Sequence, residues 1–201
     1  EFTTAEIYQP LRMTNTGYRP SSSLHNRIAP TQELAEGLLR GTVHDSTARR
    51  MGGVAGHAGV FSTASDVARF ARMLLNQGEL DGVRIFQPET VRLMTSVQSP
   101  KKVLARRGLG PRGLVFPLGS YGHTGYTGAL LWIDPFSKTF VVLLTNRLHP
   151  DGQGQVTELY GVVGTLAAQA VEGFDFQKVP GALPFRTNFI RWGTATNYLK
   201  P

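Results

Sequence analysis

The stretch Gly119-Ser-Tyr-Gly-His-Thr-Gly-Tyr-Thr-Gly128 decides how the rest of this sequence is interpreted, because it opens a run of three strand-like segments. Branched and aromatic residues, which favour strands, recur in Tyr121 to His123, Leu130 to Asp134 and Thr139 to Thr145. Pro135 to Lys138 supplies a turn, so the last two segments form a predicted hairpin. A Gly-rich step beside such a hairpin can expose backbone to a ligand.

Two helices are predicted before this hairpin. Thr63 and Asp66 stand at capping-box spacing, with the acidic side chain complementing a helix N-terminus. Apolar residues then recur at helical spacing until Asn76 to Gly78, where the helix should end. Pro88 suits the first turn of a second helix that runs to about Val97.

One more helix is predicted after the hairpin, from Gln155 to Val171. Its expected apolar face carries Val156, Leu159, Val163, Leu166 and Ala170. Shorter elements are expected elsewhere: a helical turn around Thr4 to Tyr8, a short helix or turn from Glu33 to Arg40, another from Ser46 to Met51 and a short strand from Val83 to Phe86. The fold class is therefore α/β of the α+β type, with helices flanking an antiparallel sheet.

The composition favours a globular protein and argues against several classes. A 41% apolar content in 201 residues is enough to bury a core. No run reaches the roughly 18 consecutive apolar residues of a membrane span, and the first residues lack a signal-peptide pattern. The net charge of +7 has its densest source in Lys101 to Arg112, a stretch without interleaved aromatics. We therefore expect neither a membrane span nor a nucleic-acid partner.

No metal site and no cofactor are expected. The chain has no cysteine, which excludes thiolate ligands and thiol nucleophiles. Its five histidines are far apart in sequence, and no His-Glu-x-x-His helix occurs.

His123-Thr124-Gly125, followed by hairpin strands and a long helix, resembles the third signature motif of the serine β-lactamase and penicillin-binding-protein superfamily. The resemblance is closest to the class C β-lactamase, D-aminopeptidase and esterase-like branch, where His can replace the first Lys of Lys-Thr-Gly. Three further stretches resemble this family in the right order: Glu6 to Tyr18, Gly41 to Asp45 with Gly52 to Ser62, and Asp66 to Gly82. Because several separate blocks agree, the resemblance is specific; it spans roughly residues 5 to 171.

The resemblance implies a β-lactamase/transpeptidase-like fold that is incomplete at its N-terminal side. Residues 1–171 would form the C-terminal part of such a domain. Within it, residues 1–110 would be a helical and loop region, and 111–171 would supply the sheet strands and the terminal helix. Residues 172–201 are expected to form a C-terminal arm or linker, because Pro residues and scattered aromatics replace the helical pattern there.

The resemblance also implies that the edge of the strand at His123 lines an active cleft. His123 and Thr124 would face the substrate, Gly125 would give it clearance, and the Tyr126 N–H would be one donor of an oxyanion hole. Taken alone, this segment is more typical of a Gly-rich strand entry, and it is the flanking blocks that favour the family interpretation.

His57 is a further substrate-binding candidate, because a histidine in a Gly-rich loop could line a cleft. The pair His44-Asp45 accompanies it, since Asp45 could orient a neighbouring group. The alternative is ordinary turn chemistry, in which Asp45 caps the turn that begins at Ser46 and His57 packs near its loop.

The chain departs from the family pattern at the nucleophile. The family's Ser-x-x-Lys and Tyr-x-Asn motifs would lie upstream of Glu6. No Tyr-x-Asn occurs, and the only Ser-x-x-Lys, Ser99 to Lys102, stands in the wrong order with Pro directly after its serine. The abrupt join at Gly108-Leu-Gly-Pro-Arg112 also departs from the family pattern, in which the strand usually continues. Because of both departures, we expect the chain to be a fragment.

These observations lead to one expectation and one alternative. The chain is expected to be the C-terminal portion of a serine hydrolase that acts on an amide, β-lactam or ester bond through an acyl-enzyme, and to be inactive alone. The alternative is a non-catalytic, penicillin-binding-like module for binding or assembly. Expected partners are a small-molecule or peptidoglycan-like substrate and either the missing N-terminal portion or a swapped neighbour. The resemblance implies a periplasmic or extracellular location.

Overall fold

An antiparallel sheet of three strands forms the centre of the computed structural model, which describes residues 1–96 and 113–184. The strands are β7 (Tyr121–Thr124), β8 (Ala129–Asp134) and β9 (Thr139–Leu144), in the order β7-β8-β9. His123 lies opposite Leu131, and Leu131 lies opposite Val142. The predicted strands and hairpin are therefore confirmed.

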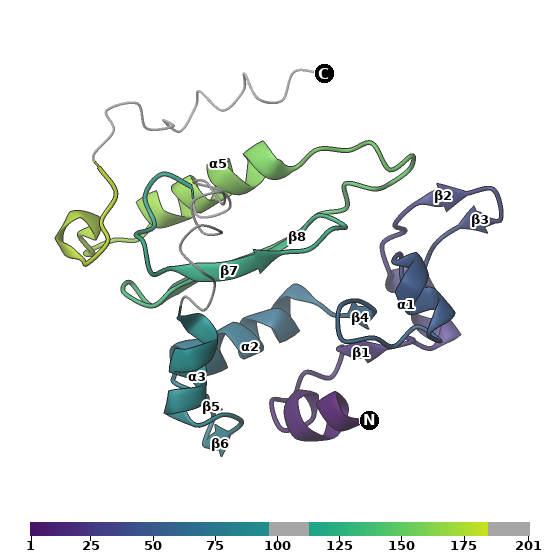
Figure 1. The fold of residues 1–201 in the computed structure, drawn as a ribbon, viewed down its shortest axis with the longest axis horizontal. Coiled ribbons are helices and arrows are strands. Elements are labelled where there is room, and N and C mark those ends of the chain that lie inside the picture. Colours follow the sequence, from purple (N-terminus) through teal and green to yellow (C-terminus); the bar gives the residue numbers. More distant parts are fainter. Residues whose placement is uncertain (97–112, 185–201) are drawn as a thin grey trace.

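Two helices cover opposite faces of this sheet, α2 (Ala64–Leu75) and α5 (Thr157–Gln169) (Figure 1). Strand β8 is apolar on both faces, and its side chains point alternately toward α2 and toward α5. Leu131 and Ile133 pack in the core under α2, whereas Leu130 and Trp132 pack in the core under α5. This alternation follows from the twofold side-chain repeat of a strand.

Helix α2 begins where its sequence predicts. The Thr63 side chain accepts a hydrogen bond from the Asp66 N–H and caps α2. The Asp66 carboxylate does not reach back to the cap. It is buried and accepts from the Asn15 N–H at 2.8 Å and the Thr16 hydroxyl at 2.7 Å. Asp66 therefore ties the N-terminal segment to the helix.

The buried side of α5 differs from the expected apolar face. Leu159 is 40% exposed and Ala170 is also exposed. The buried positions are Tyr160, Gly164, Thr165 and Ala168. A close approach explains the difference: the Leu114 N–H donates to the Thr165 hydroxyl at 3.0 Å. A Cβ on Gly113 would lie 2.6 Å from the Gly161 carbonyl, so only small residues suit this contact.

The remaining elements are short. They are η1 (Thr4–Tyr8), β1 (Gly17–Tyr18), η2 (Ser22–Arg27), β2 (Glu33–Leu34), β3 (Gly37–Leu38), α1 (Ser46–Arg50), β4 (Val60–Phe61), β5 (Glu79–Leu80), β6 (Val83–Arg84), α3 (Pro88–Thr95) and η4 (Phe176–Lys178). Strand β1 pairs with β4, and β2, β3 and α1 lie together at one side of the molecule (Figure 1).

The segment Glu33 to Arg40 is a β2–β3 hairpin, so the helix alternative is wrong and the turn alternative is correct. Pro88 occupies the first turn of α3 as predicted, although this helix ends at Thr95. The break at Gly108 to Arg112 and the basic stretch from Lys101 lie outside the described residues.

The expected C-terminal arm begins by packing against the body. Phe176 is buried and joins the core under α5, where its ring meets Phe116 edge to face at 5.8 Å. This anchors the described part of the arm, which ends at residue 184.

We predict that Asp66→Ala lowers the free energy of unfolding by about 2 kcal/mol, because two donors at one buried site lose their acceptor. Asp66→Asn keeps one acceptor oxygen and should cost about half as much. Urea unfolding checks both. Asn15→Ala is the matched control: the bond to Asp66 uses the Asn15 backbone N–H, which alanine retains. A loss in that control equal to the Asp66→Ala loss would contradict the prediction.

Candidate active site

The candidate site begins on strand β7, which pairs only with β8 among the described residues. His123 is exposed on this strand and Thr124 is half-buried. A tight turn follows: the Gly125 N–H donates to Ala129 O at 2.7 Å, and the Gly128 N–H donates to Gly125 O at 3.0 Å. The structure thus places His123 and Thr124 on a sheet edge that no described strand covers.

Tyr126 projects from that turn and is 71% exposed. Within the described part of the chain, its backbone N–H has no hydrogen-bond acceptor. Its carbonyl accepts from Arg147 Nε at 2.7 Å, and the Arg147 guanidinium lies 4.4 Å from the centre of the Tyr126 ring. Arg147 Nη1 also donates to Gly154 O at 3.2 Å. Arg147 therefore fixes this residue from both its backbone and its ring side.

His44 approaches the same turn from a segment far away in sequence. Its ring centre lies 5.9 Å from that of Tyr126. Its Nε2 is 2.8 Å from Gln32 Oε1, an atom that only accepts, so Nε2 carries the proton in the neutral ring. No sequence motif marks Arg147 or Gln32, because their contacts with Tyr126 and His44 join residues that are distant in the sequence.

Burial lowers the pKa of His44 below its usual value, and the nearby Arg49 charge lowers it further. Asp45 acts in the opposite direction, and Arg147 adds a smaller lowering effect. The folded protein therefore favours the neutral His44 ring. As the pH falls below 6.5, the unfolded chain takes up this proton first, so stability decreases with falling pH and levels off once the folded ring is also protonated.

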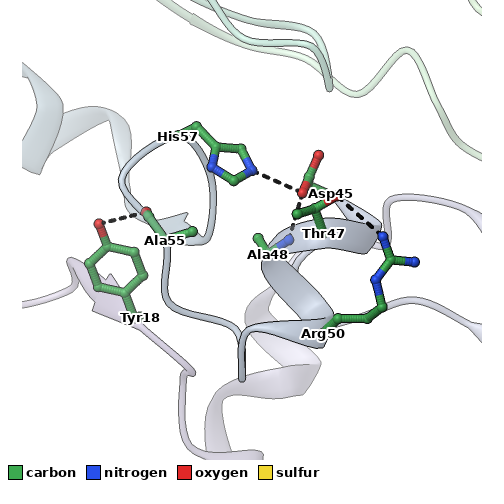
Figure 2. Close-up of polar contacts among 7 residues, drawn as sticks. All are labelled: Tyr18, Asp45, Thr47, Ala48, Arg50, Ala55 and His57. Atoms are coloured by element: carbon green, nitrogen blue, oxygen red, sulfur yellow. Dashed lines mark hydrogen bonds and ion pairs between the residues drawn. The ribbon is translucent and has the colours of Figure 1, made fainter.

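Asp45 performs both functions that the sequence left open (Figure 2). Its Oδ1 accepts from the Ala48 N–H at 2.7 Å, which caps α1, and lies 3.1 Å from His57 Nε2. The Ala48 N–H and then His57 lower the pKa of the Asp45 carboxyl. The loop that carries His57 is held by the Tyr18 hydroxyl, which donates to Ala55 O at 3.4 Å.

The site candidates form two contacting pairs. In one, the rings of His44 and Tyr126 are in contact. In the other, Asp45, the residue after His44 in the chain, contacts His57. No hydrogen bond, ion pair or ring contact in residues 1–96 and 113–184 joins His57 to His123 or Gly125. His57 is 55% exposed at its side chain, so it is oriented by Asp45 and open to solvent.

The described residues contain no group of three or more His, Asp or Glu side chains suited to holding a metal ion. None of the described helices combines the length and apolar character needed to cross a bilayer.

A family model described as Beta-lactamase matches residues 1–163. An N-acetylmuramyl-L-alanine amidase of Bacillus subtilis is 31% identical over 85% of this chain and 47% of its own length. An Escherichia coli protein with the provisional name D-alanyl-D-alanine carboxypeptidase is 34% identical over 71% of this chain and 38% of its own length. The chain thus spans about half or less of the length of these relatives.

A solved structure supports the fold. The simvastatin synthase of Aspergillus terreus superposes on this chain with a TM-score of 0.58 at 18% identity, covering 86% of this chain and 50% of that one. At this identity the similarity concerns the fold, and it agrees with helices packed on an antiparallel sheet. The expected family resemblance and fold class are confirmed.

We predict that the His44 imidazole titrates below 6.5 and that two substitutions move its pKa in opposite directions. Arg49→Gln should raise the pKa by removing a positive charge, and Asp45→Asn should lower it by removing a negative one. Histidine ring NMR spectra recorded across a pH series measure both shifts. Arg92→Gln is the control, because that exposed guanidinium pairs with Glu89. Shifts of the same sign in the two variants would contradict the electrostatic explanation.

Proposed function

The chain belongs to the beta-lactamase family, and from that premise we propose that it is the C-terminal part of a serine hydrolase. The intact enzyme would open an amide, β-lactam or ester bond through an acyl-enzyme. Relatives named as an amidase and a carboxypeptidase support a hydrolytic activity. The chemistry requires a nucleophile, a base, two donors toward the developing oxyanion and groups that seat the substrate.

One observation carries the proposal. The exposed His123 lies on the uncovered edge of β7, and in the turn that follows, the Tyr126 backbone N–H has no acceptor in the described chain. In the proposal, His123 and Thr124 contact the substrate along the edge of β7. Gly125 gives clearance, and the Tyr126 N–H serves as one oxyanion donor. Arg147 supports this role because its bond to the Tyr126 carbonyl limits rotation of that residue.

We place the nucleophile on a segment N-terminal to Glu1. The sequence has no Tyr-x-Asn, and its one Ser-x-x-Lys, Ser99 to Lys102, falls after the helix that matches the family. That the chain covers 47% and 38% of two relatives agrees with this placement. The 201 residues alone would then lack the nucleophile that the first step of acyl transfer requires.

The substrate we propose is a peptidoglycan-like peptide or a related small molecule. The names of the relatives, an N-acetylmuramyl-L-alanine amidase and a D-alanyl-D-alanine carboxypeptidase, point to that class. His57 would bind substrate as a histidine oriented by Asp45. We therefore also propose a periplasmic or extracellular location.

The edge of β7, which no described strand covers, is also compatible with a second function. A penicillin-binding-like module could keep the fold and act in binding or assembly without catalysis. The upstream half of the fold, or a swapped neighbour, would be its structural partner, because the β7 edge is uncovered in the described chain.

Covalent labelling of the full-length source protein separates these functions. We expect a fluorophosphonate or a fluorescent penicillin to label a serine upstream of Glu1. In that protein, His123→Ala should slow labelling about tenfold or more, because a hydrogen bond of roughly 1.5 kcal/mol to the reacting ligand is lost. His149→Ala, another exposed histidine, is the control. Absence of label at every site would support the binding module and reject the hydrolase.

The isolated 201-residue chain should hydrolyse neither nitrocefin nor p-nitrophenyl esters, because the proposal puts the nucleophile upstream of Glu1. The assay compares initial rates with a buffer blank. A Ser99→Ala variant tests any trace activity, since it removes the one Ser-x-x-Lys serine. Turnover above the blank would refute the proposed placement of the nucleophile.

A further inference from the structure

We propose that the Thr127 backbone N–H is a further donor to the reacting carbonyl oxygen of the substrate, and that Arg147 is the positioning residue that holds this N–H in place. The inference rests on the proposed function, which assigns the neighbouring Tyr126 N–H to the developing oxyanion. It names a donor within this chain that no sequence motif marks.

Thr127 occupies the third position of a hydrogen-bonded turn that runs from Gly125 to Gly128. The Gly128 N–H donates to Gly125 O at 3.0 Å, and neither Tyr126 nor Thr127 has a positive φ. A four-residue turn with this bond and with both central residues at negative φ is of type I. Its central residues are close to helical geometry, so their N–H groups point the same way, as they do at the start of a helix.

This turn has all of its acceptors in use and two of its donors unused. In the described part of the chain, the N–H groups of Tyr126 and Thr127 have no acceptor. Every carbonyl of the turn, by contrast, accepts a hydrogen bond: Gly125 O from the Gly128 N–H, Tyr126 O from Arg147 Nε, Thr127 O from the Arg147 N–H and Gly128 O from the Thr145 hydroxyl.

Arg147 acts on the Thr127 N–H through a single peptide plane. A trans peptide is planar, with its carbonyl and its N–H pointing in opposite directions. The plane that carries Tyr126 O also carries the Thr127 N–H, so the 2.7 Å bond from Arg147 Nε limits the directions that this N–H can take. Donation to the carbonyl also polarises the peptide and strengthens its N–H as a donor. Arg147 would thus tune the donor without touching the substrate.

Arg147 is itself held from several sides. Its Nη1 donates to Gly154 O at 3.2 Å, and its guanidinium carbon lies 4.4 Å from the centre of the Tyr126 ring. Its backbone N–H donates to Thr127 O at 2.9 Å. A Cβ on Gly128 would lie 2.9 Å from Arg147 N, so the two segments pass very close to each other. A donor fixed in this way needs no rearrangement as charge develops on the substrate oxygen.

An amide-to-ester substitution removes the donor and keeps the side chain. In the full-length source protein, replacing Thr127 by its α-hydroxy acid should slow covalent labelling by a fluorophosphonate about 100-fold, the loss typical of one oxyanion donor. The dissociation constant of the initial, non-covalent complex should change less than about threefold, because this donor acts on charge that appears in the transition state. A normal labelling rate in the Thr127 ester would overturn the proposal.

The matched control is the same ester at Glu172. This residue is exposed, and its N–H also has no acceptor in the described chain. The Glu172 ester should be labelled at the normal rate. An equal loss in both esters would mean a general effect of the substitution and would reject the Thr127 donor.

A double-mutant cycle tests the role of Arg147. Arg147→Gln should slow labelling about tenfold in the amide protein and little further in the Thr127 ester, because it acts through the N–H that the ester lacks. Equal losses in both backgrounds would reject the positioning role. Arg50→Gln, at an exposed arginine of α1, should be labelled normally. If the Thr127 ester does not fold, Arg147→Gln decides: a folded variant with a normal rate would overturn the proposal.

The second donor and the hydrolase can fail separately. No label on the unmodified protein would reject the hydrolase and, with it, the Thr127 donor. An unmodified protein that is labelled at the same rate as its Thr127 ester would leave the hydrolase intact and would reject the donor alone.

Discussion

The double burial of β8 is the constraint on which the rest of this structure depends. This strand has a neighbour on each side and a helix on each face. Leu130 and Ile133, which point to opposite faces, are each only 1% exposed. A shift of one residue in its pairing would exchange the two faces, so packing under α2 and α5 determines the register. That register then sets the position of everything attached to the ends of the strands.

The geometry around Tyr126 is one consequence of that register. Because Ala129 pairs with Leu144, the residues just before β8 meet those just after β9. The Arg147 N–H therefore donates to Thr127 O at 2.9 Å, and its side chain reaches back to Tyr126. The sheet thus positions the Arg147 guanidinium against Tyr126, whose backbone N–H has no acceptor in the described part of the chain.

His44 reaches the same place through a different set of contacts. The Asn146 side chain donates to Pro30 O, and the Glu33 N–H donates to Pro150 O at 2.8 Å. These bonds bring the β2–β3 hairpin against the segment that follows β9. The histidine then lies between Tyr126 and α1, where Arg49 and Asp45 act on its charge in opposite directions. Long-range hydrogen bonds between the hairpin region and the segment after β9 thereby contribute to the electrostatics of the site.

The sequence by itself determined the features that depend on neighbouring residues. The strands of the sheet, the Thr63 cap of α2, the Pro88 start of α3 and the dual potential of Asp45 all follow from short-range patterns. The motif around His123 also pointed to the family. Tertiary structure alone decided the buried side of α5, where Gly113 approaches closely, and the meeting of His44, Tyr126 and Arg147. The reason is physical: these contacts join residues tens of positions apart, and their energies depend on distances that only the packed chain defines.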